Sequence, residues 1–220
     1  MKNKKIFIAC DTSNINKVKK IIKHTHTKKL KIGYKFGLEF ILSKNGRTFI
    51  SKLKNKIIFC DSKMMDIPNT MKSAVNALKD LRINYLTVHI SSGLEALRAV
   101  KKVSGKIKIV GVTILTSLDN KNLKEIGYTK SVKNLVLHQA KLAKKARLDA
   151  LVCGPNEVKY VRKIFKKEII TPGVRFNKNT QDQKRTMHPS KIKSDWLVCG
   201  RIITLGNIKN NLNKLINSLK

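Results

Sequence analysis

Eight short apolar runs recur along the chain, each followed by a turn and then by a segment whose apolar residues are spaced three or four positions apart. The first pattern is typical of a strand buried on both faces, and the second of an amphipathic helix. The apolar runs occupy residues 6–10, 31–37, 56–63, 85–90, 107–115, 150–154, 169–174 and 196–203. The helix-like segments are 15–23, 38–54, 69–81, 93–103, 131–146, 156–167, a short one near 189–193, and 207–219.

This alternation of strand and helix predicts the fold. Strands that are apolar throughout and alternate with helices form a parallel sheet covered by helices. Eight such units close most naturally into a (β/α)8 barrel. The 220 residues contain no linker or low-complexity tract, and their number suits one barrel. We therefore expect an α/β protein, a single TIM-barrel domain spanning residues 1–220.

Polar residues gather at the carboxyl ends of the predicted strands, where active sites of such barrels are built. One of these polar residues lies within the second predicted strand. The others lie at or just after the ends of the first, third, fifth, seventh and eighth predicted strands. They are Asp11, Lys35, Asp61, Lys63, Thr116, Ser117, Arg175, Gly200 and Arg201. Asp66 follows in the turn after the third strand, so that three of only 13 acidic residues fall at the predicted mouth.

The segment DSKMMDIPNT, residues 61–70, places two carboxylates around one ammonium group. Asp61 and Lys63 are two positions apart on a predicted strand, which puts their side chains on one face. Asp66 begins the turn that follows. Two nearby carboxylates favour the protonated form of a lysine. Such a lysine can donate a proton, whereas a Schiff-base nucleophile must be neutral. An ion-pair network that only braces the rim of the barrel is the alternative.

Charge raises a further possibility, because 48 Lys and Arg residues against 13 Asp and Glu give a formal net charge of +35. Nucleic-acid recognition favours arginine and a localised patch. This chain has only eight arginines, and its 40 lysines are scattered through nearly every segment. The charge therefore indicates a solvated basic surface that attracts anions, and we expect no specific nucleic-acid partner.

The remaining composition points to a cytoplasmic protein without a metal. No run of 18 apolar residues is present, and the apolar part of the N-terminal segment is too short for a signal peptide. The four cysteines, Cys10, Cys60, Cys153 and Cys199, lack the CxxC spacing of a metal site. We expect them to be buried as small apolar side chains.

Several motifs together resemble those of the orotidine 5'-phosphate decarboxylase family. DSKMMDIPNT is similar to the family signature D-x-K-x-x-D-I-P-N-T. Six further segments match in order along nearly the whole chain, namely ACD at 9–11, KFGLEF at 35–40, LTS at 115–117, TPGVR at 171–175, DQKR at 182–185 and CGRIIT at 199–204. One match could arise by chance, but seven in register with the predicted strands could not.

The resemblance implies decarboxylation of orotidine 5'-phosphate (OMP) to UMP, in pyrimidine biosynthesis, by a homodimer without a metal or organic cofactor. It makes Lys63 the proton donor to C6, within a charged array completed by Asp61, Asp66 and Lys35. Asp66 and Thr70 are then expected to reach the site of the neighbouring subunit. The other implied contacts are Asp11 and Lys35 with the ribose, Thr116 or Ser117 with the pyrimidine, and Arg175, Gln183, Gly200 and Arg201 with the phosphate.

Two alternatives remain from the sequence. Enzymes related to hexulose-phosphate synthase also carry D-x-K-x-x-D, but use magnesium and act on sugar phosphates. IPNT, TPGVR and DQ favour the nucleotide enzyme. The second alternative is a basic barrel that binds nucleic acid without catalysis, which steep salt dependence of binding would reveal.

Overall fold

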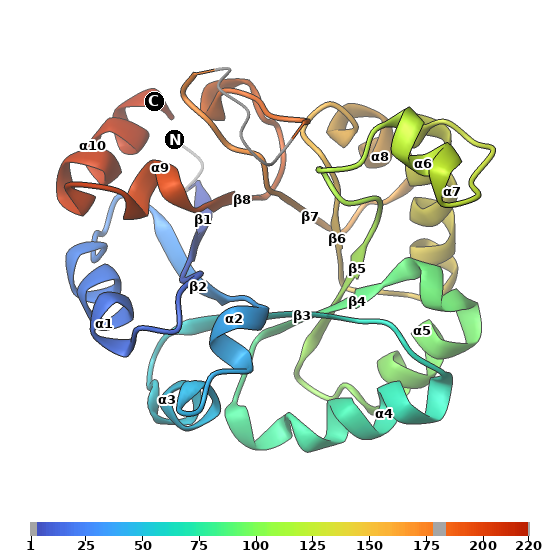
Figure 1. Cartoon of the computed structure of the whole chain (residues 1–220), viewed down its shortest axis with the longest axis horizontal. Helices are drawn as coiled ribbons and strands as arrows, with labels where there is room; N and C mark the ends of the chain where they lie inside the picture. The colour runs from blue at the N-terminus through green and yellow to red at the C-terminus, as the bar shows by residue number, and fades with distance from the viewer. Residues whose placement is uncertain (1–3, 178–183, 220) are drawn as a thin grey trace.

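The computed structural model describes residues 4–177 and 184–219, which form a closed barrel of parallel strands in the order β1 to β8. Each predicted apolar run contributes one strand, and Figure 1 shows the strands in a ring with the helices outside. The strands are β1 Lys5–Ala9, β2 Lys31–Phe36, β3 Ile57–Met64, β4 Tyr85–His89, β5 Lys108–Val112, β6 Ala150–Val152, β7 Glu168–Thr171 and β8 Trp196–Cys199. The predicted (β/α)8 fold is confirmed.

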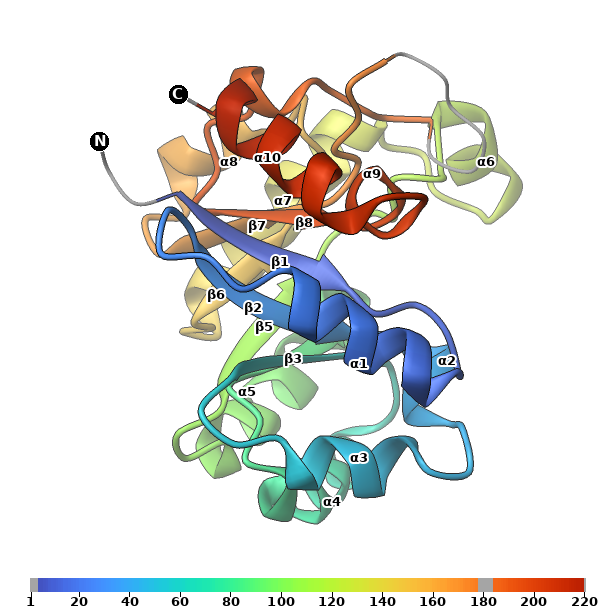
Figure 2. The same ribbon diagram turned by 90° about the vertical axis from the view of Figure 1, so that its left-hand side faces the viewer.

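Helices cover the outer face of the barrel, as the side view in Figure 2 also shows. The α-helices are α1 Ile15–His24, α2 Leu38–Ile41, α3 Gly46–Lys52, α4 Pro68–Ala77, α5 Gly93–Val103, α6 Asn120–Glu125, α7 Val132–Lys145, α8 Val158–Ile164, α9 Arg201–Thr204 and α10 Ile208–Ser218. Short 3-10 helices are η1 Lys79–Leu81, η2 Ile90–Ser92 and η3 Pro189–Lys191. Among the described residues, no helix has the length and apolar character needed to cross a membrane.

The structure differs from the predicted boundaries where local contacts override periodicity. The expected helix 38–54 is split into α2 and α3, and the turn between them brings Gly46 so close to α2 that a Cβ there would lie 1.8 Å from the Phe40 carbonyl oxygen. The expected strand 196–203 ends at Cys199, and residues 201–204 form α9 instead. The periodicity did not predict α6, a short helix that begins with a capping box formed by Asp119 and Asn122.

Aromatic side chains fill the interior of the barrel below the mouth. Phe7 and Trp196 stack with ring centroids 4.1 Å apart, and Phe59 and Tyr85 pack around Phe7. The β2 strand makes room for this cluster with Gly33, because a Cβ there would lie 2.6 Å from the Phe7 ring. The filled interior leaves the carboxyl ends of the strands as the floor of the site.

A carboxylate closes the opposite, amino-terminal end of the barrel. Glu168 accepts hydrogen bonds from Tyr85 Oη at 2.9 Å, Trp196 Nε1 at 3.1 Å, Lys108 Nζ at 2.9 Å and Lys5 Nζ at 3.3 Å. Burial alone would raise the pKa of Glu168. The hydrogen bonds from Lys108, Trp196 and Tyr85 outweigh burial and lower that pKa from 4.5 to about 2. The folded state therefore favours the charged carboxylate.

The lowered pKa corresponds to somewhat more than about 3 kcal/mol, and partial solvent exposure of the carboxylate reduces this value. We therefore expect Glu168→Gln to lower the free energy of unfolding at pH 7 by about 2 kcal/mol. A carboxyl group with a depressed pKa stabilises the fold above its unfolded pKa, and the effect is lost as the pH falls through the folded pKa. The difference between wild type and variant should therefore shrink between about pH 5 and pH 2. Urea unfolding across this range measures it, with Glu95→Gln on the exposed surface of α5 as the control. An equal difference at both ends of the range would contradict this account.

Candidate active site

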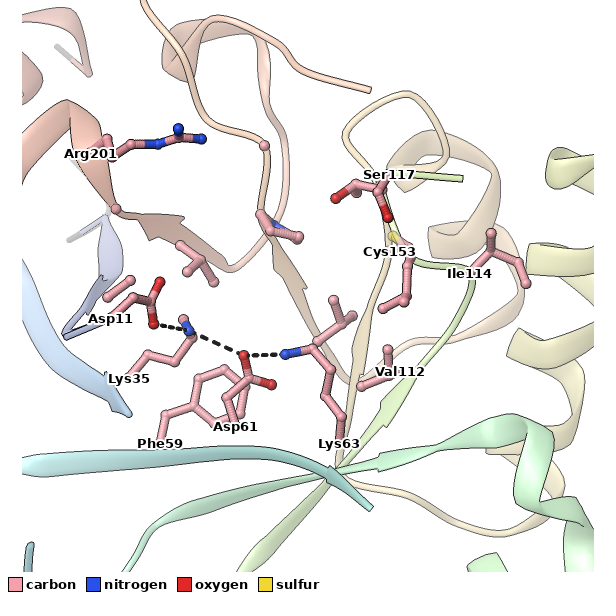
Figure 3. Close-up of a pocket in the computed structure, with 18 of the residues that line it drawn as sticks. Asp11, Lys35, Phe59, Asp61, Lys63, Val112, Ile114, Ser117, Cys153 and Arg201 are labelled. Carbon is pink, nitrogen blue, oxygen red and sulfur yellow. Dashed lines mark hydrogen bonds and ion pairs between the residues drawn. The ribbon is translucent and has the colours of Figure 1, made fainter. Parts of the chain in front are cut away.

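Four charged side chains form one continuous chain at the carboxyl end of the barrel (Figure 3). The Lys35 Nζ atom lies 2.9 Å from Asp11 Oδ1 and 3.2 Å from Asp61 Oδ2. The Lys63 Nζ atom lies 2.8 Å from the same Asp61 Oδ2 atom. Asp61 thus bridges two ammonium groups, and carboxylate alternates with ammonium from Asp11 to Lys63. The sequence predicted that all four would meet at the mouth, and the structure brings them together.

Neighbouring strands fix this order. Ala9 of β1 pairs with Lys35 of β2, and Lys35 pairs with Phe59 of β3, so that Asp11 and Asp61, each two residues further on, flank Lys35. Gly37 leaves space for the array, because a Cβ there would lie 2.9 Å from Asp11 Oδ1. The alternation of charge therefore follows from the order of the first three strands.

Lys63 reaches Asp61 by a different route from the one predicted. A regular strand would direct the two side chains to one face, but the pairing of β3 with β4 shifts between Cys60 and Met64. Within this irregular segment Lys63 has a φ of 48°, in the left-handed region that non-glycine residues rarely adopt. The expected contact is present, although a bulge and not simple alternation produces it. Such strain is commonly found at functional sites.

The electrostatics of the array favour charged groups. Burial alone would raise the pKa of the Asp61 carboxyl, but the positive charges of Lys35 and Lys63 and their hydrogen bonds lower it below the ordinary value. Burial alone would lower the pKa of Lys35, but the charges of Asp61 and Asp11 and their hydrogen bonds raise it. Asp61 is therefore a carboxylate at neutral pH, and Lys35 an ammonium.

The array forms one wall of a cavity of about 550 Å³. Five other residues predicted for the site also line it, namely Thr116, Ser117, Arg175, Gly200 and Arg201. In Figure 3 Arg201 and Ser117 lie at separate sides of the cavity, away from the charged array. Thr116 and Ser117 were expected at the end of a strand, but β5 already ends at Val112, so both lie in the loop that follows. The volume lies within the range typical of small-molecule sites.

Two other predicted residues are not part of this cavity. Asp66 and Thr70 are exposed on the turn after β3 and on α4, and neither lines the cavity of its own chain. Asp66 Oδ1 instead accepts a hydrogen bond of 2.7 Å from the Ile67 backbone N–H. Within the described part of a single chain, Lys63 thus meets Asp61 but not the expected second carboxylate. Gln183 lies outside the described residues.

The sequence analysis did not predict a buried ion pair between Arg185 and Glu157, which lies next to the residues that line the cavity. Arg185 Nη1 lies 2.7 Å from Glu157 Oε2, and Arg185 Nη2 donates 2.9 Å hydrogen bonds to the carbonyl oxygens of Ile114 and Leu115. Arg185 belongs to the DQKR segment quoted above, and its charge was a signal that could have marked it as a candidate site residue. Its partners could not be predicted, because they are remote from it in sequence. The pair ties the loop before η3 to the segment that carries Thr116.

A second missed residue is Thr87, which is fully buried on β4 next to the array. Its hydroxyl group contacts both Asp61 and Lys63. The sequence holds no signal for it, because a threonine inside an apolar strand is common.

Comparison with known proteins gives one consistent family. The profile of the family described as "Orotidine 5'-phosphate decarboxylase / HUMPS family" matches residues 4–210. A protein of Wolbachia pipientis subsp. Culex pipiens (strain wPip), named orotidine 5'-phosphate decarboxylase, is 41% identical over 209 residues, which cover 90% of this chain and 91% of the relative. A relative of the same name from Ehrlichia chaffeensis is 36% identical over 212 residues, covering 92% of this chain and 90% of the relative.

Solved structures agree with the sequence relatives. The crystal structure of orotidine 5'-phosphate decarboxylase from Lactobacillus acidophilus superposes with a TM-score of 0.84 at 28% identity, covering 99% of this chain and all of that one. A second structure, from Methanocaldococcus jannaschii and described as complexed with the inhibitor BMP, has a TM-score of 0.79 at 23% identity and covers 99% of both chains. At that identity the second comparison supports the fold alone.

Proposed function

The chain belongs to the orotidine 5'-phosphate decarboxylase / HUMPS family, and we propose that it is an OMP decarboxylase, a carboxy-lyase that converts OMP to UMP and carbon dioxide. The observation that carries this proposal is the alternating Asp11–Lys35–Asp61–Lys63 array on the wall of the cavity. Relatives that share the name over most of this chain support the same activity. One catalytic domain spanning residues 1–220 is part of the proposal.

In the proposed mechanism Lys63 delivers a proton to C6 of the pyrimidine as carbon dioxide leaves. The departing group leaves negative charge on C6, and an ammonium fixed at that position stabilises the charge where it develops. Asp61 holds Lys63 in place through the 2.8 Å contact. Lys35 and, from the partner subunit, Asp66 complete the charged surroundings. The groups are in place before the reaction, so little reorganisation is needed during the step.

The remaining groups hold the substrate away from the reacting carbon. We assign Asp11 and Lys35 to the ribose hydroxyls and Thr116 or Ser117 to the pyrimidine. Arg175, Gln183, Gly200 and Arg201 are assigned to the 5'-phosphate. The loops after strands seven and eight commonly bind phosphate in barrels of this class, and Arg175, Gly200 and Arg201 follow β7 and β8 here. Phosphate binding can then supply energy that organises the reacting end.

The magnesium-dependent alternative remains open to a direct test. Within residues 4–177 and 184–219, no three His, Cys, Asp or Glu side chains come together as a group that could hold a metal ion. We expect wild-type protein to remove the ultraviolet absorbance of OMP at the same rate with and without a chelator. Loss of activity in the chelator that magnesium restores would overturn the proposal of a mechanism without a metal. Failure of the protein to consume OMP under any of these conditions would overturn the proposed function.

We further propose a homodimer in which each site is shared. Two large apolar side chains beside Asp66 are exposed in the single chain, Met65 by 60% and Ile67 by 66%. Leu42 is exposed by 78% and Leu38 by 49% in the neighbouring α2 region. A group of exposed apolar side chains beside a charged residue such as Asp66 is typical of a protein–protein interaction surface. A partner seated there would bring its own Asp66 and Thr70 toward the site of this chain.

Mixing two inactive variants tests the shared site. If Lys63 acts in its own subunit and Asp66 acts in the partner, Lys63→Ala and Asp66→Ala dimers should complement each other. Random exchange of equal amounts makes about half of the dimers hybrid, each with one complete site, so about a quarter of wild-type activity should return. The decarboxylation rate before and after mixing measures this.

Subunit exchange must be shown independently, for example with mass-tagged chains. A mixture of two Lys63→Ala preparations is the matched control and should stay inactive. If hybrids form and activity stays at the parental level, Asp66 acts within its own chain. The cytoplasmic location and the role in pyrimidine biosynthesis stay predictions.

A further inference from the structure

The bulge that carries Lys63 leaves β3 and β4 with unequal numbers of residues. Cys60 pairs with Leu86 and Met64 pairs with Val88. Between these two pairs β3 has Asp61, Ser62 and Lys63, whereas β4 has only Thr87. The backbone of three residues on β3 therefore faces a single residue, and the ladder of backbone hydrogen bonds is interrupted there.

The Thr87 side chain replaces the missing contacts. Its Oγ1 atom accepts a 2.7 Å hydrogen bond from the Lys63 backbone N–H. The same hydroxyl donates a 3.1 Å hydrogen bond to Asp61 Oδ1. A backbone N–H can only donate, and a hydroxyl has only one proton to give. The direction of both hydrogen bonds is therefore fixed: the Thr87 hydroxyl accepts from the Lys63 N–H and donates its hydrogen bond to the Asp61 carboxylate.

This arrangement divides the two oxygens of Asp61 between different tasks. Oδ1 accepts from Thr87, and Oδ2 contacts both Lys35 and Lys63. Rotation of the carboxylate would break the Thr87 hydrogen bond, so the hydroxyl keeps Oδ2 pointed at the two ammonium groups. At the same time the Thr87 hydroxyl accepts the hydrogen bond of the Lys63 backbone N–H. Lys63 has a φ of 48°, which is unfavourable for a residue with a Cβ.

We propose that Thr87 is a positioning residue, whose hydroxyl group sets both the orientation of the Asp61 carboxylate and the backbone conformation from which Lys63 reaches the reacting carbon. Thr87 is fully buried and does not line the cavity, so it acts through these two residues and not on the substrate. The catalytic consequence rests on the proposed OMP decarboxylase function. The structural consequence, a Lys63 that depends on Thr87 for its conformation, does not.

Two pairs of variants isolate the hydroxyl group. Thr87→Val removes it at nearly constant shape, and Thr87→Ser keeps it while removing the methyl group. Thr87→Ala and Thr87→Ser differ only in the oxygen atom, so this pair keeps the test available if the valine variant does not fold. Thr25→Val is the matched control, because Thr25 is also fully buried and donates a 2.7 Å hydrogen bond to the Ile21 carbonyl. Thr25 is the C-cap residue of α1 and precedes β2, so it lies toward the amino-terminal end of the barrel, opposite the candidate site.

The kinetic readout is kcat for OMP together with the dissociation constant of UMP. We expect Thr87→Val and Thr87→Ala to lower kcat by about 100-fold, the cost of a displacement of roughly 1 Å at the reacting groups. Thr87→Ser should stay close to wild type, and UMP binding should change by no more than about twofold in all variants. Thr25→Val should lose stability but keep its kcat. Equal kcat values for the alanine and serine variants, or a parallel loss of UMP binding, would overturn the proposal.

A crystal structure of Thr87→Ala supplies a readout without catalysis. We expect Lys63 to leave the left-handed region, or Asp61 Oδ2 to lose its contact with Lys63 Nζ. An unchanged array would overturn the proposal even if the kinetics agreed. Wild-type protein that fails to decarboxylate OMP would instead defeat the proposed function, and the structural comparison would still decide the role of Thr87.

Discussion

Replacing Lys63 with alanine is expected to abolish decarboxylation of OMP while nucleotide still binds. In the proposed mechanism this ammonium group both stabilises charge at C6 and delivers the proton, so its loss removes both effects at once. A group that stabilises developing charge contributes about 3 kcal/mol or more, which is at least about 100-fold in rate, and a positioned proton donor contributes a further factor of about 100 to 10,000. We therefore expect kcat to fall by several powers of ten. The groups assigned to phosphate and ribose lie on other strands and loops, which leaves the binding of UMP largely intact.

Single-turnover decarboxylation and UMP titration measure the two parts of this prediction. Lys141→Ala is a suitable control, because it removes one positive charge from the exposed face of α7 in an already very basic protein. The control should behave as wild type. A Lys63→Ala enzyme that keeps even a tenth of wild-type activity would remove this lysine from the central role.

Replacing Arg201 with alanine should weaken substrate binding and slow turnover together. A hydrogen bond to a charged group is worth about 1.5 to 3 kcal/mol, and so we expect kcat/KM to fall by about 10- to 100-fold. In the proposed mechanism part of the phosphate binding energy is used only in the transition state, so kcat should fall and KM should rise. Steady-state kinetics with OMP separates the two constants.

A phosphate-free substrate tests the same assignment from the other side. Added phosphite dianion should partly restore turnover of the truncated nucleoside by wild type, and Arg201→Ala should weaken that rescue. Arg98→Ala on the exposed face of α5 removes an arginine from a part of the surface that does not line the cavity, and should leave both kinetic constants in place. Unchanged constants in Arg201→Ala would show that the phosphate does not bind after β8.

The fold could be predicted because its signal is one of burial. A strand covered on both faces is apolar throughout, and each of the eight apolar runs marked a strand for that reason. The errors arose where a single contact decides the conformation. Gly46 allows the chain to turn back on Phe40, and no periodicity carries that information. The short helix after Gly200 is apolar enough to resemble the end of a strand.

The site was predicted less completely, because its geometry depends on neighbours that are remote in sequence. The positions of Asp11, Lys35 and Asp61 follow from strand order, and their charges made them visible. The conformation of Lys63 depends on the unequal pairing of two strands, and a short segment does not reveal a pairing register. Thr87 and Arg185 act from β4 and from a distant loop, and only the folded chain brings them to the site. Asp66 is exposed in one chain, so its expected contact depends on a second one.

Proton NMR of the product formed from OMP in deuterium oxide tests the central claim most directly. The exchangeable protons of the Lys63 ammonium become deuterons in this solvent, so the proposed mechanism delivers deuterium to the carbon that loses carbon dioxide. We predict that wild type yields UMP without a proton signal at C6, with the signal of the neighbouring H5 collapsed to a singlet, and that Lys63→Ala yields no product. Formation of labelled UMP by Lys63→Ala at a tenth of the wild-type rate or faster, or no UMP from wild-type protein, would contradict the account.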